Sequence, residues 1–136
     1  MLTLKMKGSY HFQGRENWQT GLIEVDELGN FSGRIIDPNS TASRREVEGN
    51  FEIRDGEVIL RFVKKPTGSP YLPINYLLRK PNAASKTREE GIRGRYEGSW
   101  SYDEIPVAAV GIGVVNRTLV IGPAKETRNK AYLSLI

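Results

Sequence analysis

The 136-residue sequence contains no cysteine and a single histidine, His11. Without cysteine, the chain cannot form a disulfide scaffold, hold an iron–sulfur cluster or thiolate zinc ion, or use a cysteine nucleophile. One imidazole cannot supply a metal site that needs two. No segment approaches the roughly 20 consecutive apolar residues that a membrane-spanning helix requires. We therefore expect a protein without a metal or other cofactor and without a membrane span.

The first seven residues are apolar only at alternate positions and contain no continuous hydrophobic segment. A signal peptide needs such a segment, so we expect no secretion signal. The formal charge is modest, at +4 from 20 Lys and Arg against 16 Asp and Glu. The length suits one domain with one core. These features predict a single cytoplasmic domain over residues 1–136.

Long helices are also excluded, because glycine and proline interrupt the chain throughout. The sequence has 14 Gly and 7 Pro, and only residues 124–136 run for more than ten positions without either. Each costs roughly 1 (Gly) or 3 (Pro) kcal/mol in a helix interior. Only residues 82–90 and 124–130 are predicted to hold a helical turn or two.

Between these interruptions, apolar residues recur at every second position, which is the pattern of strands with one buried face. In the first such segment Leu2, Leu4 and Met6 alternate with polar residues. The same alternation recurs around Phe51 and Trp100. Ten strands are predicted in all, over residues 3–13, 17–26, 30–37, 45–54, 57–64, 71–79, 92–102, 107–115, 117–122 and 130–135.

Short turns join most of these strands. Leu28-Gly29-Asn30 and Asp55-Gly56 contain residues that tolerate positive φ, and Asn116-Arg117 is a third predicted hairpin turn. Residues 66–73 hold three prolines and a glycine and are predicted to be an extended loop. Many short strands joined by tight turns favour a meander that closes on itself and so has no exposed edge. We predict an all-β, antiparallel up-and-down barrel of about eight to ten strands, with a β-sandwich as the alternative.

A glycine, a small or polar residue and an aromatic residue occur together in several strands. Examples are Gly8-Ser9-Tyr10, Gly49-Asn50-Phe51 and Gly98-Ser99-Trp100, and the hairpin Asp26–Gly33 carries a similar pattern. In these features the chain resembles the calycins, the group of lipocalin-type and avidin-type barrels. The resemblance implies a calycin-like barrel that binds a small apolar or amphipathic molecule in its interior, with catalysis in a minority of members.

Aromatic residues on the inward side of the predicted strands are the candidate ligand contacts. An eight-stranded barrel has room for its own side chains or for one small ligand, so these aromatics either fill the core or line a site. Eight are predicted to face inward: Tyr10, Phe12, Trp18, Phe51, Phe62, Tyr76, Tyr96 and Trp100. The predicted ligand-binding set is Tyr10, Trp18, Phe51, Tyr76, Tyr96 and Trp100, together with Arg93 and Arg95 near the barrel mouth.

Positive charge is concentrated in residues 61–95. This segment has nine Lys and Arg against two Glu, a charge of +7, so the other 101 residues sum to −3. Such a segment with interleaved tyrosines fits an anionic ligand, and it also fits a nucleic acid bound through phosphate neutralisation and base stacking. A solvated surface is the third interpretation. We expect a small-molecule ligand and keep nucleic-acid binding by this basic face as the alternative.

The apolar end of the chain, Ala131–Ile136, must be buried, either by closing its own barrel or at an interface with a second copy. The second case leaves an oligomeric scaffold as a further alternative. No catalytic motif stands out: His11 lies among polar positions, Glu46 and Glu48 lie on a predicted surface, and Gly111-Ile112-Gly113 lacks the third glycine of a dinucleotide loop. The sequence thus favours a binding protein over an enzyme and assigns no catalytic or metal-binding residue.

Overall fold

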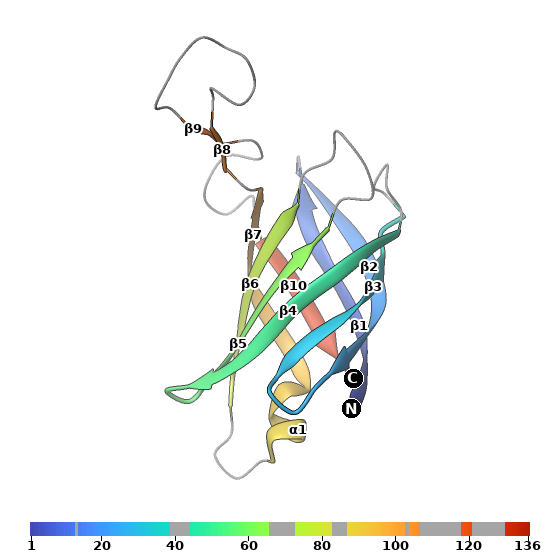
Figure 1. Cartoon of the computed structure of the whole chain (residues 1–136). Helices are drawn as coiled ribbons and strands as arrows, with labels where there is room; N and C mark the ends of the chain where they lie inside the picture. The colour runs from blue at the N-terminus through green and yellow to red at the C-terminus, as the bar shows by residue number, and fades with distance from the viewer. Residues whose placement is uncertain are drawn as a thin grey trace.

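A computed structural model describes residues 1–12, 14–38, 44–65, 73–82, 87–102, 104–106, 118–120 and 130–136. Eight antiparallel strands form a closed barrel in the order β1-β10-β7-β6-β5-β4-β3-β2 (Figure 1), which confirms the predicted all-β up-and-down barrel. The barrel strands are β1 (Leu2–Phe12), β2 (Arg15–Val25), β3 (Asn30–Ile36), β4 (Arg44–Arg54), β5 (Glu57–Lys64), β6 (Ile74–Pro81), β7 (Gly94–Tyr102) and β10 (Lys130–Leu135).

Two further strands lie outside the barrel. β8 (Glu104–Pro106) and β9 (Thr118–Val120) pair with each other in a two-stranded sheet. The predicted strand over 117–122 therefore contains β9, whereas the predicted strand over 107–115, the turn at Asn116-Arg117 and most of the predicted loop 66–73 lie outside the described residues. The strand predicted over 71–79 corresponds to β6, which begins at Ile74 and ends at Pro81. The strand predicted over 92–102 starts too early but ends correctly, because β7 runs from Gly94 to Tyr102.

The barrel is closed by the C-terminal strand. β10 lies between β1 and β7, with Leu133 opposite Gly8 on one side and opposite Tyr96 on the other. The main chains of Lys5 and Ile136 also exchange hydrogen bonds of 3.1 and 3.0 Å. The apolar C-terminal segment was predicted either to close its own barrel or to bind a second copy, and the structure shows that it closes the barrel.

The two predicted glycine turns have the expected backbone. Asp55 and Gly56 have φ values of 53° and 77°, and Gly29 has a φ of 87°. At the second turn, one carboxylate oxygen of Asp26 accepts hydrogen bonds from the main-chain N–H groups of Leu28 and Asn30, each 2.9 Å long. Both turns join neighbouring strands at the lower end of the barrel in Figure 1.

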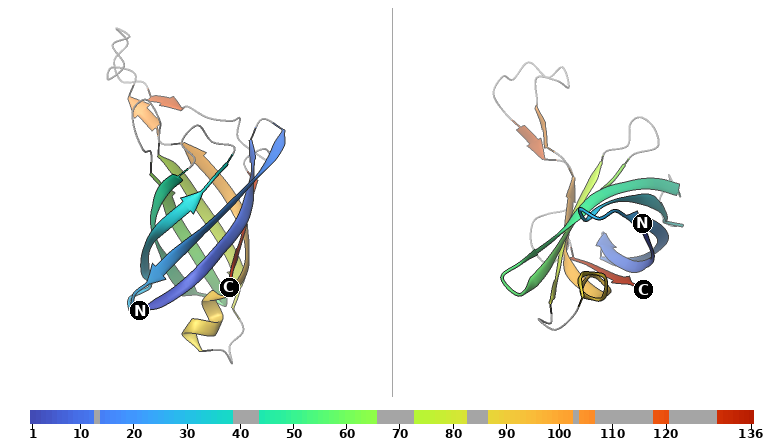
Figure 2. Two further views of the ribbon diagram at one scale, coloured as in Figure 1. Left: turned by 90° about the vertical axis from the view of Figure 1, so that its right-hand side faces the viewer. Right: turned by 60° about the horizontal axis from the view of Figure 1, so that its bottom comes forward.

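The helix α1 (Arg88–Ile92) lies at this lower end (Figure 2). The side chain of Thr87 caps it by accepting a hydrogen bond from the main-chain N–H of Glu90. Arg88 donates to the main-chain oxygen of Glu27 in the β2–β3 turn, and Ile92 is buried. The hydroxyl of Tyr96 on β7 donates to the main-chain oxygen of Ile92 at 2.6 Å. These contacts fix the helix against the base of the barrel.

The interior of the barrel is apolar over most of its length. It is lined by the inward residues of all eight strands and by Ile92, with Phe31 and Phe51 packed 5.2 Å apart between ring centroids in the lower half. The left view of Figure 2 shows that the strands are strongly tilted relative to the barrel axis. Such strongly coiled strands bring neighbouring main chains close together on the inner side.

Inward glycines make this close approach possible. A Cβ atom at Gly98 would collide with the main-chain oxygen of Leu77, and one at Gly49 would collide with the main-chain oxygen of Arg61. A Cβ atom at Gly8, Gly21 or Gly33 would likewise collide with a main-chain oxygen of the neighbouring strand. The glycine of the recurring glycine-aromatic triplet is therefore a requirement of barrel coiling.

This requirement gives a direct test by substitution. We expect Gly98→Ala to lower the free energy of unfolding by about 2 to 3 kcal/mol, because the new methyl group forces two paired strands apart. Ser99→Ala, on the exposed face of the same strand, is the matched control and should change the free energy of unfolding by less than about 0.5 kcal/mol. Urea unfolding followed by tryptophan fluorescence measures both, and equal effects of the two substitutions would contradict this role of Gly98.

Candidate functional site

A group of polar and charged side chains is buried inside the upper end of the barrel, where β1, β3, β5 and β7 finish. Gln19, Asp37, Arg45 and Lys64 are each at most 6 % exposed, and Lys64 is 0 % exposed. Lys64 is the last residue of β5, Arg45 is the second residue of β4, and Asp37 directly follows β3. Because neighbouring strands are antiparallel, these positions fall at the same end. We call these four residues, with Tyr10 and Tyr76, the upper cluster.

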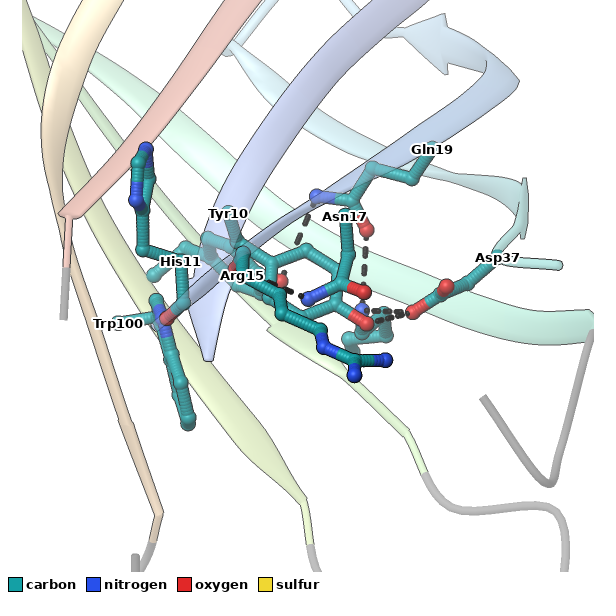
Figure 3. Close-up of polar contacts among 9 residues, drawn as sticks. Tyr10, His11, Arg15, Asn17, Gln19, Asp37 and Trp100 are labelled. Atoms are coloured by element: carbon teal, nitrogen blue, oxygen red, sulfur yellow. Dashed lines mark hydrogen bonds and ion pairs between the residues drawn. The ribbon is translucent and has the colours of Figure 1, made fainter. Parts of the chain in front are cut away.

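Lys64 is the centre of the upper cluster. Its Nζ donates to Oε1 of Gln19 at 2.9 Å and to Oδ2 of Asp37 at 3.2 Å. The same Asp37 oxygen accepts a hydrogen bond from the hydroxyl of Tyr10, and Nε2 of Gln19 lies 3.4 Å from the hydroxyl of Tyr76. Figure 3 shows the side chains of Tyr10, Gln19 and Asp37 converging on this network from different strands.

Aromatic rings surround the ammonium group. Nζ of Lys64 lies 4.4 Å from the ring centroid of Tyr10 and 5.5 Å from that of Tyr76. Tyr76 stacks on Phe62 at 4.5 Å, and Tyr10 meets Trp100 edge to face at 6.0 Å. Ring faces attract a cation that has lost its water, so the aromatic walls and Asp37 together offset part of the cost of burying this charge.

Burial controls the proton affinities in the cluster. It lowers the pKa of the Lys64 ammonium from 10.5 to about 8, even though Asp37 acts to raise it, and the charge of Arg45 lowers it further. Burial also raises the pKa of the Tyr10 hydroxyl above its ordinary value, and the hydrogen bond to Asp37 raises it further. Loss of solvation therefore outweighs the ion pair at Lys64.

The predicted ligand-binding aromatics divide between the two halves of the barrel. Tyr10, Tyr76 and Trp100 lie in the upper half, where the indole N–H of Trp100 donates to the main-chain oxygen of His11 at 2.9 Å. Phe51 and Tyr96 are also buried, but they lie in the lower half, where their rings are 6.3 Å apart and Tyr96 is bound to α1. Burial raises the pKa of the Tyr96 hydroxyl. The structure thus places three of the six predicted aromatics beside the buried charges.

Trp18 does not face inward as predicted, and its side chain is 55 % exposed. The inward side of β2 is occupied by Gln19, Gly21, Ile23 and Val25, so Trp18 lies on the opposite, outer side of the strand. The prediction followed hydrophobicity at this position, whereas the strand alternation places the polar Gln19 inside.

Arg93, which directly precedes β7, and Arg95 on β7 lie at the helix end of the barrel, far from the upper cluster. Arg93 follows α1 and forms an ion pair with Glu89, 3.4 Å long. Arg95 faces outward, 3.6 Å from a carboxylate oxygen of Glu97 and 4.9 Å from the ring centroid of Tyr132. The structure therefore does not bring either arginine together with Tyr10, Tyr76 or Trp100.

The basic segment 61–95 is divided between the interior and several outer faces. Lys64 points into the barrel. Three other basic residues form ion pairs with glutamates of the preceding strand: Arg61 with Glu52, Lys65 with Glu48, and Arg79 with Glu57. The Arg61 guanidinium also lowers the pKa of the Glu52 carboxyl through their hydrogen bond. The charge of +7 is thus partly balanced by acids that precede the segment. Nucleic-acid binding by this face stays a prediction.

Sequence reasoning missed Gln19, Asp37, Arg45 and Lys64, although the sequence carries a signal for them. Each continues the inward alternation of its strand: Lys64 follows Phe62 by two residues, and Arg45 precedes Val47 by two. Polar residues on an inward alternation, all at the same end of an antiparallel meander, indicate a buried polar site. Counting Lys64 with the surface charges of residues 61–95 hid this signal.

The described residues contain no group of three or more His, Asp or Glu placed to hold a metal ion. No helix in this described part of the chain is long and apolar enough to cross a membrane. The chain was compared with protein-family models, curated proteins and solved structures, and none of them matches it.

The buried pair predicts strong coupling between Asp37 and Lys64. Asp37→Asn or Lys64→Met alone leaves one charge buried without its counterion, and we expect each to cost about 3 to 5 kcal/mol of unfolding free energy. The double variant removes both charges and should cost less than the sum by about 1 to 3 kcal/mol. Urea unfolding of the four proteins measures the coupling, and additive effects would contradict a direct interaction.

The lowered pKa of Lys64 predicts how stability changes with pH. The unfolded chain holds the Lys64 proton up to about pH 10.5 and the folded chain only up to about pH 8, so stability rises with pH between these values. From pH 8 to 9.5 we expect the wild type to gain about 1 to 2 kcal/mol over the Asp37→Asn/Lys64→Met variant, which lacks the titrating amine. The range stops below pH 10 because the raised pKa of Tyr10 has the opposite effect above it. Parallel stability curves for the two proteins would show that Lys64 is solvated.

Proposed function

We propose that this chain is a non-enzymatic, calycin-like binding protein whose barrel takes up a small amphipathic molecule with an anionic head group. The head group binds at Lys64 in the upper cluster, and the apolar body contacts the surrounding rings. The single observation that carries the proposal is the fully buried ammonium of Lys64, held inside the barrel between the rings of Tyr10 and Tyr76.

Buried charge supports this choice of ligand class. The ammonium of Lys64 is buried, and it forms an ion pair with Asp37 and a hydrogen bond with Gln19. An ammonium ion removed from water is stabilised by each further anion or hydrogen-bond acceptor that it meets. A ligand carboxylate beside Lys64 would supply that stabilisation, and it would also raise the pKa of the amine toward its ordinary value.

The walls and the architecture support an apolar ligand body. Phe12, Phe62 and Trp100 extend the apolar surface next to the upper cluster, and Phe12 is only partly buried. An eight-stranded barrel is the size class that holds one small ligand. The resemblance to calycins, carried by the glycine-aromatic strands, implies the same use of the interior.

Matched acids and alcohols test the proposal. We expect 3-phenylpropanoate and decanoate to raise the melting temperature of the wild type by several degrees at saturating concentration, since a ligand at 100 times its Kd adds about 2.7 kcal/mol. The alcohols 3-phenylpropanol and decanol, which have the same apolar bodies, should give much smaller shifts. Native mass spectrometry should show one bound acid per chain.

Two variants test whether the acid binds at the upper cluster. In the Asp37→Asn/Lys64→Met variant, which lacks the ammonium and its counterion, the acid and the alcohol should give equal shifts. Lys65→Met, which removes an outward amine at the next position, should keep the preference for the acid. If the wild type does not distinguish acids from alcohols, or if the double variant keeps the preference, the proposal is wrong.

A further inference from the structure

The upper cluster contains a buried primary amine, which is a nucleophile whenever it loses its proton. We propose that Lys64 captures aldehyde ligands covalently, as an imine between its Nζ and the carbonyl carbon. This inference rests on the proposed function, because it needs a small molecule to enter the same end of the barrel. It adds a reaction to a site that otherwise only binds.

The geometry already holds one carbonyl oxygen against the amine. Oε1 of Gln19 is 2.9 Å from Nζ of Lys64, the distance of a direct hydrogen bond. The second contact of this amide, from Nε2 of Gln19 to the hydroxyl of Tyr76, is long at 3.4 Å, so the amide is weakly held on that side. We expect an aldehyde whose oxygen takes the place of the Gln19 oxygen to hold its carbonyl carbon next to Nζ.

The surroundings leave the amine partly free of its proton near neutral pH. Among the described residues, the titratable and charged groups that act on it come from β1 (Tyr10), the end of β3 (Asp37), β4 (Arg45) and β6 (Tyr76). Burial and Arg45 lower the pKa of Lys64, to about 8, while Asp37 acts in the opposite direction. At pH 7 about one Lys64 amine in ten is then neutral, against fewer than about one in a thousand for an ordinary lysine.

The reaction needs no oxidant or reductant. The neutral amine forms a C–N bond to the aldehyde carbon, and Asp37 takes one proton from the nitrogen and passes it to the carbonyl oxygen. The second N–H proton then moves through Asp37 to the resulting hydroxyl, which leaves as water as the C=N bond forms. One aldehyde and one amine thus give one imine and one water. Asp37 stays beside the nitrogen and can stabilise the protonated imine.

Reductive trapping tests this directly. The full-length protein is incubated with 3-phenylpropanal or decanal and sodium cyanoborohydride, which reduces an imine to a stable secondary amine, and peptide mass spectrometry locates the adducts. We expect Lys64 to be modified at least tenfold faster than the exposed lysines Lys5 and Lys7. The rate at Lys64 should level off near pH 8, whereas the rates at the exposed lysines continue to rise. Modification spread evenly over all lysines would overturn the inference.

Two controls separate this inference from the proposed function. Lys64→Arg keeps the buried charge without the nucleophilic amine and should lose the fast adduct, whereas Lys65→Arg should keep it. In the wild type, 3-phenylpropanoate should protect Lys64 from 3-phenylpropanal. If carboxylates bind in the thermal-shift test but Lys64 shows no preferential adduct, imine capture is wrong and ligand binding stands. If the adduct forms but carboxylates do not bind, the anionic-ligand proposal fails alone.

Discussion

The ion pair between Lys64 and Asp37 is the interaction on which the account of this molecule depends. Its two side chains are 0 % and 1 % exposed, and they lie inside one end of a barrel that is apolar over most of its length. Burying two charges costs more than an apolar core would, and their attraction repays that cost only in good geometry. The hydrogen bonds from Tyr10 and to Gln19, and the ring faces around Nζ, offset part of that cost.

The rest of the fold holds this pair away from water. Closure by β10 gives every barrel strand two neighbours, and the inward glycines let the strands coil tightly around a narrow interior. At the lower end, α1 is fixed by Arg88 and Tyr96 against the base. The two ends therefore differ in kind: one is closed by a helix over apolar residues, and the other carries buried charge next to aromatic walls. This difference is the reason for proposing ligand binding at the upper end.

The sequence predicted the architecture well because a two-residue alternation and the turns Asp55-Gly56 and Leu28-Gly29-Asn30 are local properties of the chain. It predicted the site poorly because the site is made of strand ends that meet only in the closed barrel. Hydrophobicity placed Trp18 inside, yet the alternation of β2 turns it outward and Gln19 inward. The charge count placed Lys64 on a basic surface, whereas the alternation of β5 turns its side chain into the interior. In both cases the alternation of the strand was the better guide.

The most direct test of the buried charge is the proton affinity of Lys64 itself. In protein labelled with ¹³C at lysine, the Cε chemical shift follows the titration of each amine separately, and Lys64→Arg identifies its signal. The account predicts a midpoint near pH 8 for Lys64, well below those of Lys5 and Lys7, and an increase of that midpoint when 3-phenylpropanoate is bound. A midpoint at the ordinary value of 10.5, unchanged by the carboxylate, would contradict the buried site and the functions proposed for it.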